Sequence, residues 1–310
     1  MKPLIVLIGP TASGKTSLAI GIAKALGCEI ISGDSMQFYR HMDIGTAKIT
    51  PKETQGIPHH LIDILEPNEP YTVADFQKDC YRLIAEIVNR GKIPFLVGGT
   101  GLYVNAVLDG YTFATAPGGD ESFRIAQEKE AQNQPSDYLY QKLLRIDPLT
   151  AVKLHPSDTR RIIRALEVYE KTGRPLSEQA TKQPPAYHSV VLGIAWERQL
   201  LYQRIDQRVD QMLADGLEDE VRYLLSAGYS RKDKPMNGLG YKQMVSYLNG
   251  EIPKDEAIYQ IKRDTRHFAK RQMTWWRKEN RVQWLDGQDP HLLVHSLRII
   301  QENLPELALF

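Results

Sequence analysis

Cysteine is almost absent from this chain, since only Cys28 and Cys80 occur among 310 residues. Two thiols so far apart form neither a Cys-x-x-Cys metal site nor a disulfide framework, and we expect both to be reduced. Long hydrophobic runs are also lacking, because none approaches the ~20 apolar residues that cross a membrane. The short apolar run at the N-terminus leads into a glycine loop and predicts a buried strand rather than a signal peptide. A cytoplasmic location is therefore expected.

An excess of one charge is missing as well. The chain holds 39 Lys and Arg against 38 Asp and Glu, with 42% hydrophobic residues, which is an ordinary composition for a globular protein. Overall charge therefore does not indicate a nucleic-acid partner, and any such surface must come from local clustering. The length allows one large domain with an insertion, or two domains.

Short apolar segments alternate with helical patterns in the first hundred residues. Strands are expected at Leu4–Ile8, Glu29–Ser32 and Ile93–Val97, with helices at Lys15–Leu26 and Val73–Arg90 between them. Alternation of this kind predicts an α/β fold, in which a parallel sheet is flanked by helices.

The alternation is interrupted and then resumes. A loop rich in Gly, Pro, Thr and Ala at Tyr111–Asp120 and a second loop at Lys182–Pro185 bound a polar helical stretch, which predicts a mostly helical insertion domain at residues 114–188. The core then comprises residues 1–113 and 189–310. Its later elements are expected to be strands at Val190–Trp196 and Arg281–Leu285, and helices at Leu200–Ser226, Lys242–Leu248 and Lys254–Arg277.

A phosphate-binding loop follows the first predicted strand. Residues 9–16 match Gly-x-x-x-x-Gly-Lys-[Ser/Thr] in full and precede a predicted helix, which is the context that the motif requires. Backbone N–H groups, the helix dipole and the lysine would all face phosphate oxygens, and the threonine hydroxyl can bind Mg²⁺. The residues expected to hold the phosphates are Gly9, Thr11, Ala12, Ser13, Gly14, Lys15 and Thr16.

The parts of an ordinary nucleotide hydrolase are not found beside this loop. Neither of the GTPase motifs Asn-Lys-x-Asp and Asp-x-x-Gly occurs. The strand Ile93–Val97 is followed by Gly98-Gly99-Thr100, where an ordinary nucleotide hydrolase has the Asp that is the second protein ligand of Mg²⁺. The loop thus predicts a diphosphate or triphosphate ligand without predicting nucleotide hydrolysis.

Asp34 and Thr100 each follow a predicted strand, and ligands of parallel sheets bind at such carboxyl ends. Asp34 can serve there as a general base or a metal ligand, although a helix N-cap is an equal alternative from position alone. Thr100 has the same location, and its alternative is a simple turn residue.

Seven stretches together resemble the bacterial tRNA dimethylallyltransferases, also called tRNA isopentenyl-pyrophosphate transferases. The stretches are Gly9–Thr16, Asp34–Tyr39, Met42–Lys48, Gly56–Asp63, Val97–Tyr103, Arg161–Val168 and Thr265–Arg277. Small departures occur at Ile49 and at Gly238-Leu239, and the insertion is the least similar part. The resemblance implies transfer of a dimethylallyl group from dimethylallyl diphosphate to N6 of adenosine 37, beside the tRNA anticodon.

The resemblance also implies roles for individual residues. Asp34 would accept the proton of the amine, Arg208 would contact the diphosphate, and Thr16 would hold Mg²⁺, the expected cofactor. Without the resemblance Arg208 is read as a solvated helix residue. The positions that it assigns to tRNA are Asp34, Ser35, Met36, Gln37, Thr100, Arg124, Arg160, Arg161 and Arg164. From sequence alone the last three arginines could equally form a lid or a surface cluster.

The predicted C-terminal helix is strongly basic. Residues 262–281 hold eight Lys and Arg against two Asp and Glu, and six of the cations fall on one arc of the helix. The opposite arc holds Phe268, Trp275 and Trp276. We expect the basic face to follow tRNA phosphates, with Arg266 and Lys270 among the contacts, and a membrane-surface helix is the alternative.

Two other functions remain open. A small-molecule kinase shares the phosphate loop, and a nucleotide-gated RNA-binding protein would share the loop and the basic helix. The oligomeric state is not determined by these patterns, which are compatible with a monomer.

Overall fold

Six parallel strands form the central sheet of the computed structural model, which describes residues 2–113, 119–179, 181–182 and 187–309. The strand order is β3-β2-β4-β1-β7-β8. The strands are β1 (Lys2–Ile8), β2 (Cys28–Ser32), β3 (His59–His60), β4 (Ile93–Gly98), β7 (Tyr187–Ala195) and β8 (Val282–Asp286). All five predicted strands are present with small shifts at their ends. The two-residue β3 was not predicted, because so short a strand has no periodic pattern.

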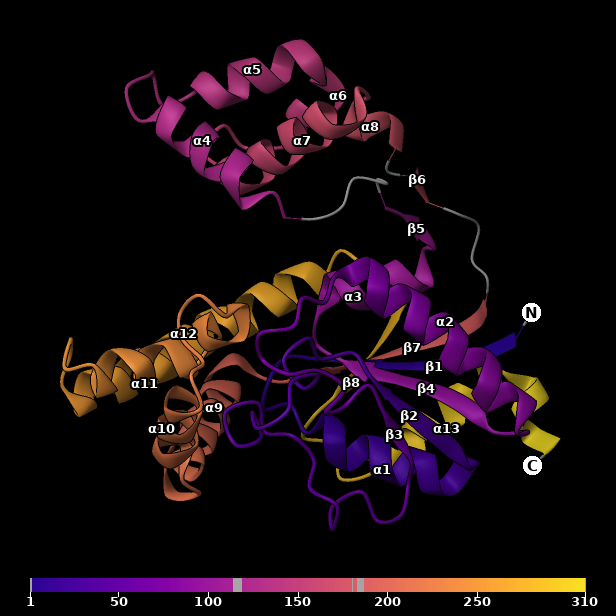
Figure 1. Ribbon diagram of the computed structural model, residues 1–310. Coiled ribbons are helices and arrows are strands. Elements are labelled where there is room, and N and C mark those ends of the chain that lie inside the picture. Colours follow the sequence, from indigo (N-terminus) through magenta and orange to yellow (C-terminus); the bar gives the residue numbers. More distant parts are fainter. Residues whose placement is uncertain (1, 114–118, 180, 183–186, 310) are drawn as a thin grey trace. The chain divides into compact units, whose positions relative to one another are not determined.

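The central strand β1 is buried on both faces, which explains its continuous apolar run. Leu4, Val6 and Ile8 join one hydrophobic cluster, while Ile5 and Leu7 join another. Helices α2 (Val73–Asn89) and α3 (Gly101–Leu108) cover the first face, and α1 (Lys15–Leu26) and α13 (Leu292–Asn303) cover the second (Figure 1). The predicted flanking of a parallel sheet by helices is confirmed.

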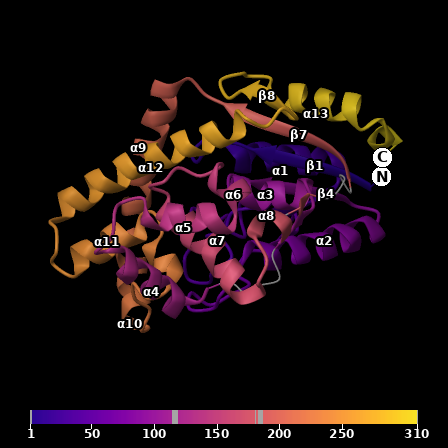
Figure 2. The same cartoon turned by 90° about the horizontal axis from the view of Figure 1, so that it is seen from above.

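A group of helices lies at the end of the sheet opposite the N-terminus (Figures 1 and 2). They are α9 (Arg198–Ala214), α10 (Leu217–Ser226), α11 (Tyr241–Leu248) and α12 (Lys254–Trp276). A single helix over Leu200–Ser226 was predicted, and this is wrong. The chain breaks at Gly216, whose φ of 103° lies in the left-handed region that favours glycine. The short 3₁₀ helices are η1 (Lys234–Asn237) and η2 (Pro305–Leu309).

The chain divides into two compact units, residues 1–108 with 187–310 and residues 109–186. The sequence placed the boundaries at 114 and 188. The smaller unit begins earlier because β5 (Tyr111–Thr112) pairs antiparallel with β6 (Thr181–Lys182) inside it. Its helices are α4 (Glu121–Ala131), α5 (Tyr138–Ile146), α6 (Pro148–Ala151), α7 (Thr159–Thr172) and α8 (Leu176–Gln179), and they share a hydrophobic cluster of their own. Residues 114–118 and 183–186 of the predicted bounding loops lie outside the described residues.

Both cysteines are buried and form no disulfide, as predicted. Within the described ranges, no helix combines the length and the hydropathy of a membrane span.

Candidate active site

A cavity of about 740 Å³ opens at the carboxyl ends of the strands, within the larger unit. Its walls come from the phosphate loop after β1, the Asp34–Gln37 turn after β2 and Gly99–Thr100 after β4. Helices α9, α11 and α12 supply further walls. The three strand ends that the sequence predicted to be neighbours therefore meet in one place, as expected for a parallel sheet.

The phosphate loop adopts the curled conformation that its sequence demands. Gly14 lies in the left-handed region with φ 88°, immediately before the first residue of α1, and Ala12 also has a positive φ of 62°. The Lys15 ammonium donates to the carbonyls of Gly9 at 2.9 Å and Pro10 at 2.7 Å. The hydroxyl of Ser13 is buried and has no hydrogen-bond partner in the described structure. A buried polar atom of this kind suits a loop that binds an anion.

Two side chains of the region after β7 hold this loop from outside. Trp196 donates its indole N–H to the Ser13 carbonyl at 3.0 Å, and Arg204 donates Nε to the Ala12 carbonyl at 2.9 Å. Since the C=O and N–H of a trans peptide point in opposite directions, fixing the Ser13 carbonyl also fixes the Gly14 N–H. Sequence reasoning missed both residues, because neither lies in a motif and each contact joins segments more than 180 residues apart.

Gln272 on α12 makes a third contact with the loop. Its Oε1 accepts from the Thr11 N–H at 2.9 Å, while its Nε2 donates to the Gly99 carbonyl at 3.1 Å. This side chain was also missed, although it lies inside a stretch that carried the resemblance. Thr16 lines the cavity and is exposed, as a hydroxyl that binds a ligand must be.

Two cations and one carboxylate act on one another inside the cavity. The pKa of Lys15 is lowered to about 8, mainly by burial and also by the nearby Arg208 cation, whereas the Asp34 carboxylate opposes both effects. Burial lowers the pKa of Arg208 as well, again opposed by Asp34. No ion-pair partner of Arg208 is found among the described residues. Two desolvated cations at a phosphate loop make a strong site for an anionic ligand.

Asp34 lies opposite the loop in a fixed turn. Its Oδ1 accepts from the Met36 N–H at 2.9 Å, and the Ser32 hydroxyl donates to Gln37 at 2.9 Å. No helix follows Asp34, so Asp34 is not a helix N-cap; its side chain instead stabilises a turn. This turn holds the carboxylate at the cavity wall. Ser35, Met36, Gln37 and Thr100 line the same cavity.

Glu220 on α10 fixes another wall of the cavity, the segment Gly45–Ala47. Its carboxylate accepts the N–H groups of three successive residues, Asp43 at 2.8 Å, Ile44 at 2.7 Å and Gly45 at 3.0 Å. It also accepts from the Tyr241 hydroxyl at 2.7 Å. No side chain fits at Gly45, because a Cβ there would lie 2.6 Å from the Tyr241 ring.

Comparison with known proteins identifies the family. A family model described as IPP transferase matches residues 37–279. A curated relative from Carboxydothermus hydrogenoformans, named tRNA dimethylallyltransferase, is 53% identical and covers 97% of both chains. A relative of the same name from Symbiobacterium thermophilum is 50% identical over 98% of this chain and 96% of its own. The chain belongs to the IPP transferase family.

Solved structures of the family share the fold. The full-length tRNA isopentenylpyrophosphate transferase of Bacillus halodurans superposes with a TM-score of 0.75 at 44% identity, covering 99% of this chain and 98% of that one. A eukaryotic dimethylallyltransferase acting on tRNA gives a TM-score of 0.76 at 29% identity, covering 99% and 78%. The family resemblance read from the sequence is confirmed.

The four arginines that the resemblance assigned to tRNA differ in their contacts within the protein. Arg124 and Arg164 both pair with Glu167, which is fully buried, at 3.1 and 2.7 Å. Arg161 pairs with Asp158 at 3.0 Å. Arg160 is exposed, and its side chain makes no ion pair within the part of the chain that the structure describes. Arg124 and Arg164 therefore also stabilise the smaller unit.

The basic helix α12 differs from its prediction. Lys262 and Arg266 were expected on an open basic face, and this is wrong, because they pair with Asp210 at 2.5 Å and Asp206 at 2.6 Å on α9. A helical wheel cannot show that another helix packs along this side. Lys270 and Arg277, in contrast, are exposed.

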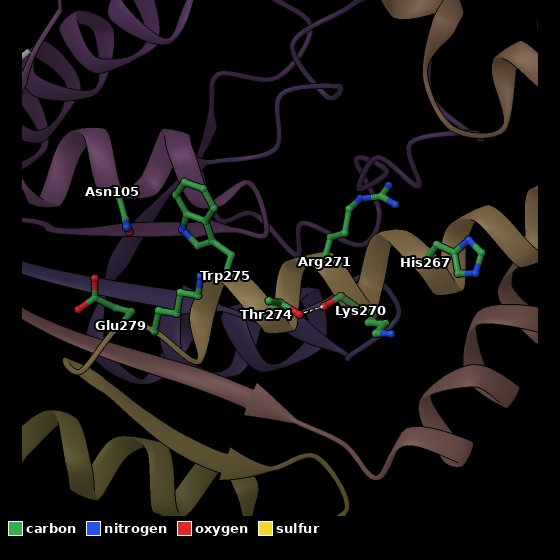
Figure 3. A pocket seen from close by; sticks show the side chains of 8 residues that line it. Asn105, His267, Lys270, Arg271, Thr274, Trp275 and Glu279 are labelled. Atoms are coloured by element: carbon green, nitrogen blue, oxygen red, sulfur yellow. Dashed lines mark hydrogen bonds between the residues drawn. The ribbon is translucent and has the colours of Figure 1, made fainter. Parts of the chain in front are cut away.

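A second cavity of about 620 Å³ lies along α12. Figure 3 shows Lys270, Arg271 and Trp275 on this helix, with Asn105 coming from α3. Trp275 was predicted on the packing side but is 38% exposed. Its ring nevertheless rests on Gly101, where a Cβ would lie 2.3 Å from the indole.

Proposed function

We propose that this chain transfers a dimethylallyl group from dimethylallyl diphosphate to N6 of adenosine 37 in tRNA. The observation that carries the proposal is a single cavity in which a phosphate loop and two desolvated cations face one carboxylate. A diphosphate leaving group needs the cations, and an amine acceptor needs the base. Curated relatives of nearly the same length are named for this transfer.

The donor diphosphate binds at the phosphate loop. The N–H groups that follow Ala12, the Lys15 ammonium and the Arg208 guanidinium converge on it, and Lys15 exchanges its two loop carbonyls for phosphate oxygens. As the allylic C–O bond breaks, negative charge gathers on the leaving diphosphate. Cations already desolvated in the site stabilise this charge without reorganising.

Asp34 acts on the acceptor amine. The N6 lone pair is delocalised into the purine ring, so the amine is a weak nucleophile until it loses its proton. The N6–C bond forms as the C–O bond to diphosphate breaks, and the N6 proton passes to the Asp34 carboxylate. The backbone N–H of Met36 holds that carboxylate in place through Oδ1, which leaves Oδ2 to accept the proton.

Mg²⁺ fits this site through few protein ligands. Among the described residues no three His, Cys, Asp or Glu side chains cluster, whereas the exposed Thr16 hydroxyl lines the cavity beside the loop. Mg²⁺ commonly binds through one or two protein oxygens together with phosphates and water, so Thr16 would hold it. When bound, it would neutralise charge on the diphosphate.

tRNA presents the base by turning it out of the anticodon loop, since an adenosine that stays stacked cannot enter the cavity. Ser35, Met36, Gln37 and Thr100 line the acceptor side of the cavity and would contact the base. Lys270 is exposed and free to bind phosphate, whereas Arg266 is shared with Asp206, so Lys270 carries the larger contribution. Arg160, Arg161, Arg164 and Arg124 would bind the anticodon-loop backbone. The activity belongs with its tRNA substrate in the cytoplasm.

Mass spectrometry of tRNA tests the proposal directly. Purified protein is incubated with Mg²⁺, dimethylallyl diphosphate and unmodified tRNA, and adenosine 37 is expected to gain one prenyl group. A parallel incubation with labelled ATP is expected to give neither phosphoryl transfer nor tRNA-stimulated hydrolysis. Label transfer from ATP to a small molecule would favour a kinase, and tRNA-stimulated hydrolysis without prenylation would favour a nucleotide-gated RNA-binding protein.

A further inference from the structure

One buried amide joins two neighbouring loops at the wall of the cavity. Gln272 is 8% exposed, and its side chain accepts from the Thr11 N–H and donates to the Gly99 carbonyl. The three segments lie far apart in the chain, since Gln272 follows Thr11 by 261 residues and Gly99 by 173. The contact therefore exists only in the folded protein.

The chemistry of the two contacts fixes the orientation of the amide. An N–H group can be satisfied only by the amide oxygen, and a carbonyl only by the amide NH₂. Turning the amide over would place two donors together and two acceptors together. A primary amide is thus required here, because a carboxylate lacks the donor and an ammonium lacks the acceptor.

The close approach of Gln272 also explains a glycine. A Cβ on Gly99 would lie 2.4 Å from Gln272 Nε2 and 3.0 Å from the Gly9 carbonyl. The strand end before Thr100 can therefore reach α12 and the phosphate loop only as glycine. This close packing ties the acceptor side of the cavity to the donor side through one side chain.

We propose that Gln272 is a positioning residue, which sets the phosphate loop and the Thr100 loop in the relative placement that the transfer needs. The inference rests on the proposed function, since it concerns the distance between the allylic carbon and the acceptor amine. Gln272 touches neither reacting group and acts through Thr11 and Gly99. Lys270 and Arg271, which neighbour Gln272 on α12, line the second cavity. The same helix therefore holds both candidate RNA-binding residues and the side chain that joins the two loops.

The proposal is tested with two variants of Gln272 and one control. Gln272→Met keeps the length of the side chain and removes both hydrogen bonds. Gln272→Glu keeps only the acceptor when ionised and regains a donor when protonated. Gln260→Met is the control, because Gln260 lies on the same helix and bonds only its neighbour Glu256 within the described structure.

Gln272→Met is expected to lower the single-turnover transfer rate by about tenfold to 100-fold, the scale of a misplaced reacting pair. Affinities for diphosphate and for tRNA, measured separately, should change less than about twofold, and the Gln260→Met protein should match wild type. Gln272→Glu should recover towards the wild-type rate as pH falls. Dividing its rate by the wild-type rate at each pH removes from the comparison the pH effects that both proteins share, including the titration of Lys15.

A fall in diphosphate affinity that accounts for the whole loss of activity would overturn the proposal, as would an unchanged rate or a Gln272→Glu ratio independent of pH. Hydrogen exchange in residues 9–16 and 98–101 provides a readout that does not need transfer. Both segments should exchange faster in Gln272→Met. If wild type transfers nothing but these segments still loosen, the proposed function fails while the link stands; if neither segment changes, the link itself is wrong.

Discussion

The guanidinium of Arg204 stacks on the indole of Trp196, with Cζ 4.2 Å from the ring centroid. Both residues donate hydrogen bonds to successive carbonyls of the phosphate loop, so the stack holds two peptide units with one rigid pair. The Trp196 ring also packs closely on Gly287, where a Cβ would lie 2.1 Å from the ring nitrogen. The loop is therefore held in its binding conformation before any ligand arrives, which lowers the cost of binding.

Arg204→Met is expected to raise the KM for dimethylallyl diphosphate by about tenfold, the equivalent of one hydrogen bond to a charged group. The KM for tRNA should not change, because the contact acts on the loop alone. Steady-state kinetics with each substrate varied in turn measures both. Arg198→Met is the matched control, since Arg198 lies on the same helix over Tyr202 at 5.3 Å without touching the loop. Equal effects of the two substitutions would contradict the account.

The low pKa of Lys15 predicts a pH dependence of donor binding. Lys15 is charged below about pH 8 and loses its proton above it, so kcat/KM for the donor should fall as pH rises through this value. A guanidinium stays charged throughout the range. In Lys15→Arg the fall should disappear, whatever the absolute rate of that variant. An unchanged profile in Lys15→Arg would assign the titration to another group.

The exposed cations of α12 predict the salt dependence of tRNA binding. Removing a cation that binds one phosphate should flatten the log–log slope of affinity against salt by about one unit. The pair Lys270→Ala with Arg277→Ala should therefore reduce the slope more than Lys262→Ala with Arg266→Ala, because Asp210 and Asp206 already hold the latter cations. Parallel lines for wild type and the first pair would show that this side of α12 does not face tRNA.

Glu220 predicts a large effect on stability away from the chemistry. Glu220→Ala leaves three backbone N–H groups without their charged acceptor and should lower the free energy of unfolding by about 3 kcal/mol. Urea unfolding measures this loss. Glu218→Ala provides the comparison, because Glu218 also lies on α10 and, among the described residues, pairs only with the long side chains of Arg222 on α10 and Lys254 on α12. That change should cost less than about 1 kcal/mol.

The sequence predicted the sheet and the first helix well because their signals are local. Apolar runs marked the strands, and the glycine loop marked the start of α1 at Lys15. The break at Gly216 and the helix α13 were missed. Helical patterns continue on both sides of Gly216 and predict one helix, and no side chain caps the start of α13 at His291. The exposure of Lys262 and Arg266 was mispredicted for another reason, because a wheel drawn on one helix does not contain the acidic partners on α9.

The residues of the candidate site also fall into a group that the sequence predicts and a group that it does not. Residues that line the cavity close to the strand ends, such as Lys15 and Asp34, could be predicted from their position in the sequence. Residues that hold those loops, such as Arg204, Gln272 and Glu220, come from distant helices and have no pattern of their own. The sequence shows only the glycines that allow these side chains to approach closely, and a glycine by itself does not indicate which residue packs against it.

The central claim is that Asp34 takes the proton of the acceptor amine while the phosphate loop holds the donor, and one measurement tests it most directly. Single-turnover transfer is followed with tRNA and dimethylallyl diphosphate bound in advance to wild type and to Asp34→Asn, which keeps the shape and removes the basicity. The account predicts a loss of about 10²-fold or more in the variant, with diphosphate affinity unchanged. A near-normal transfer rate in Asp34→Asn would contradict it.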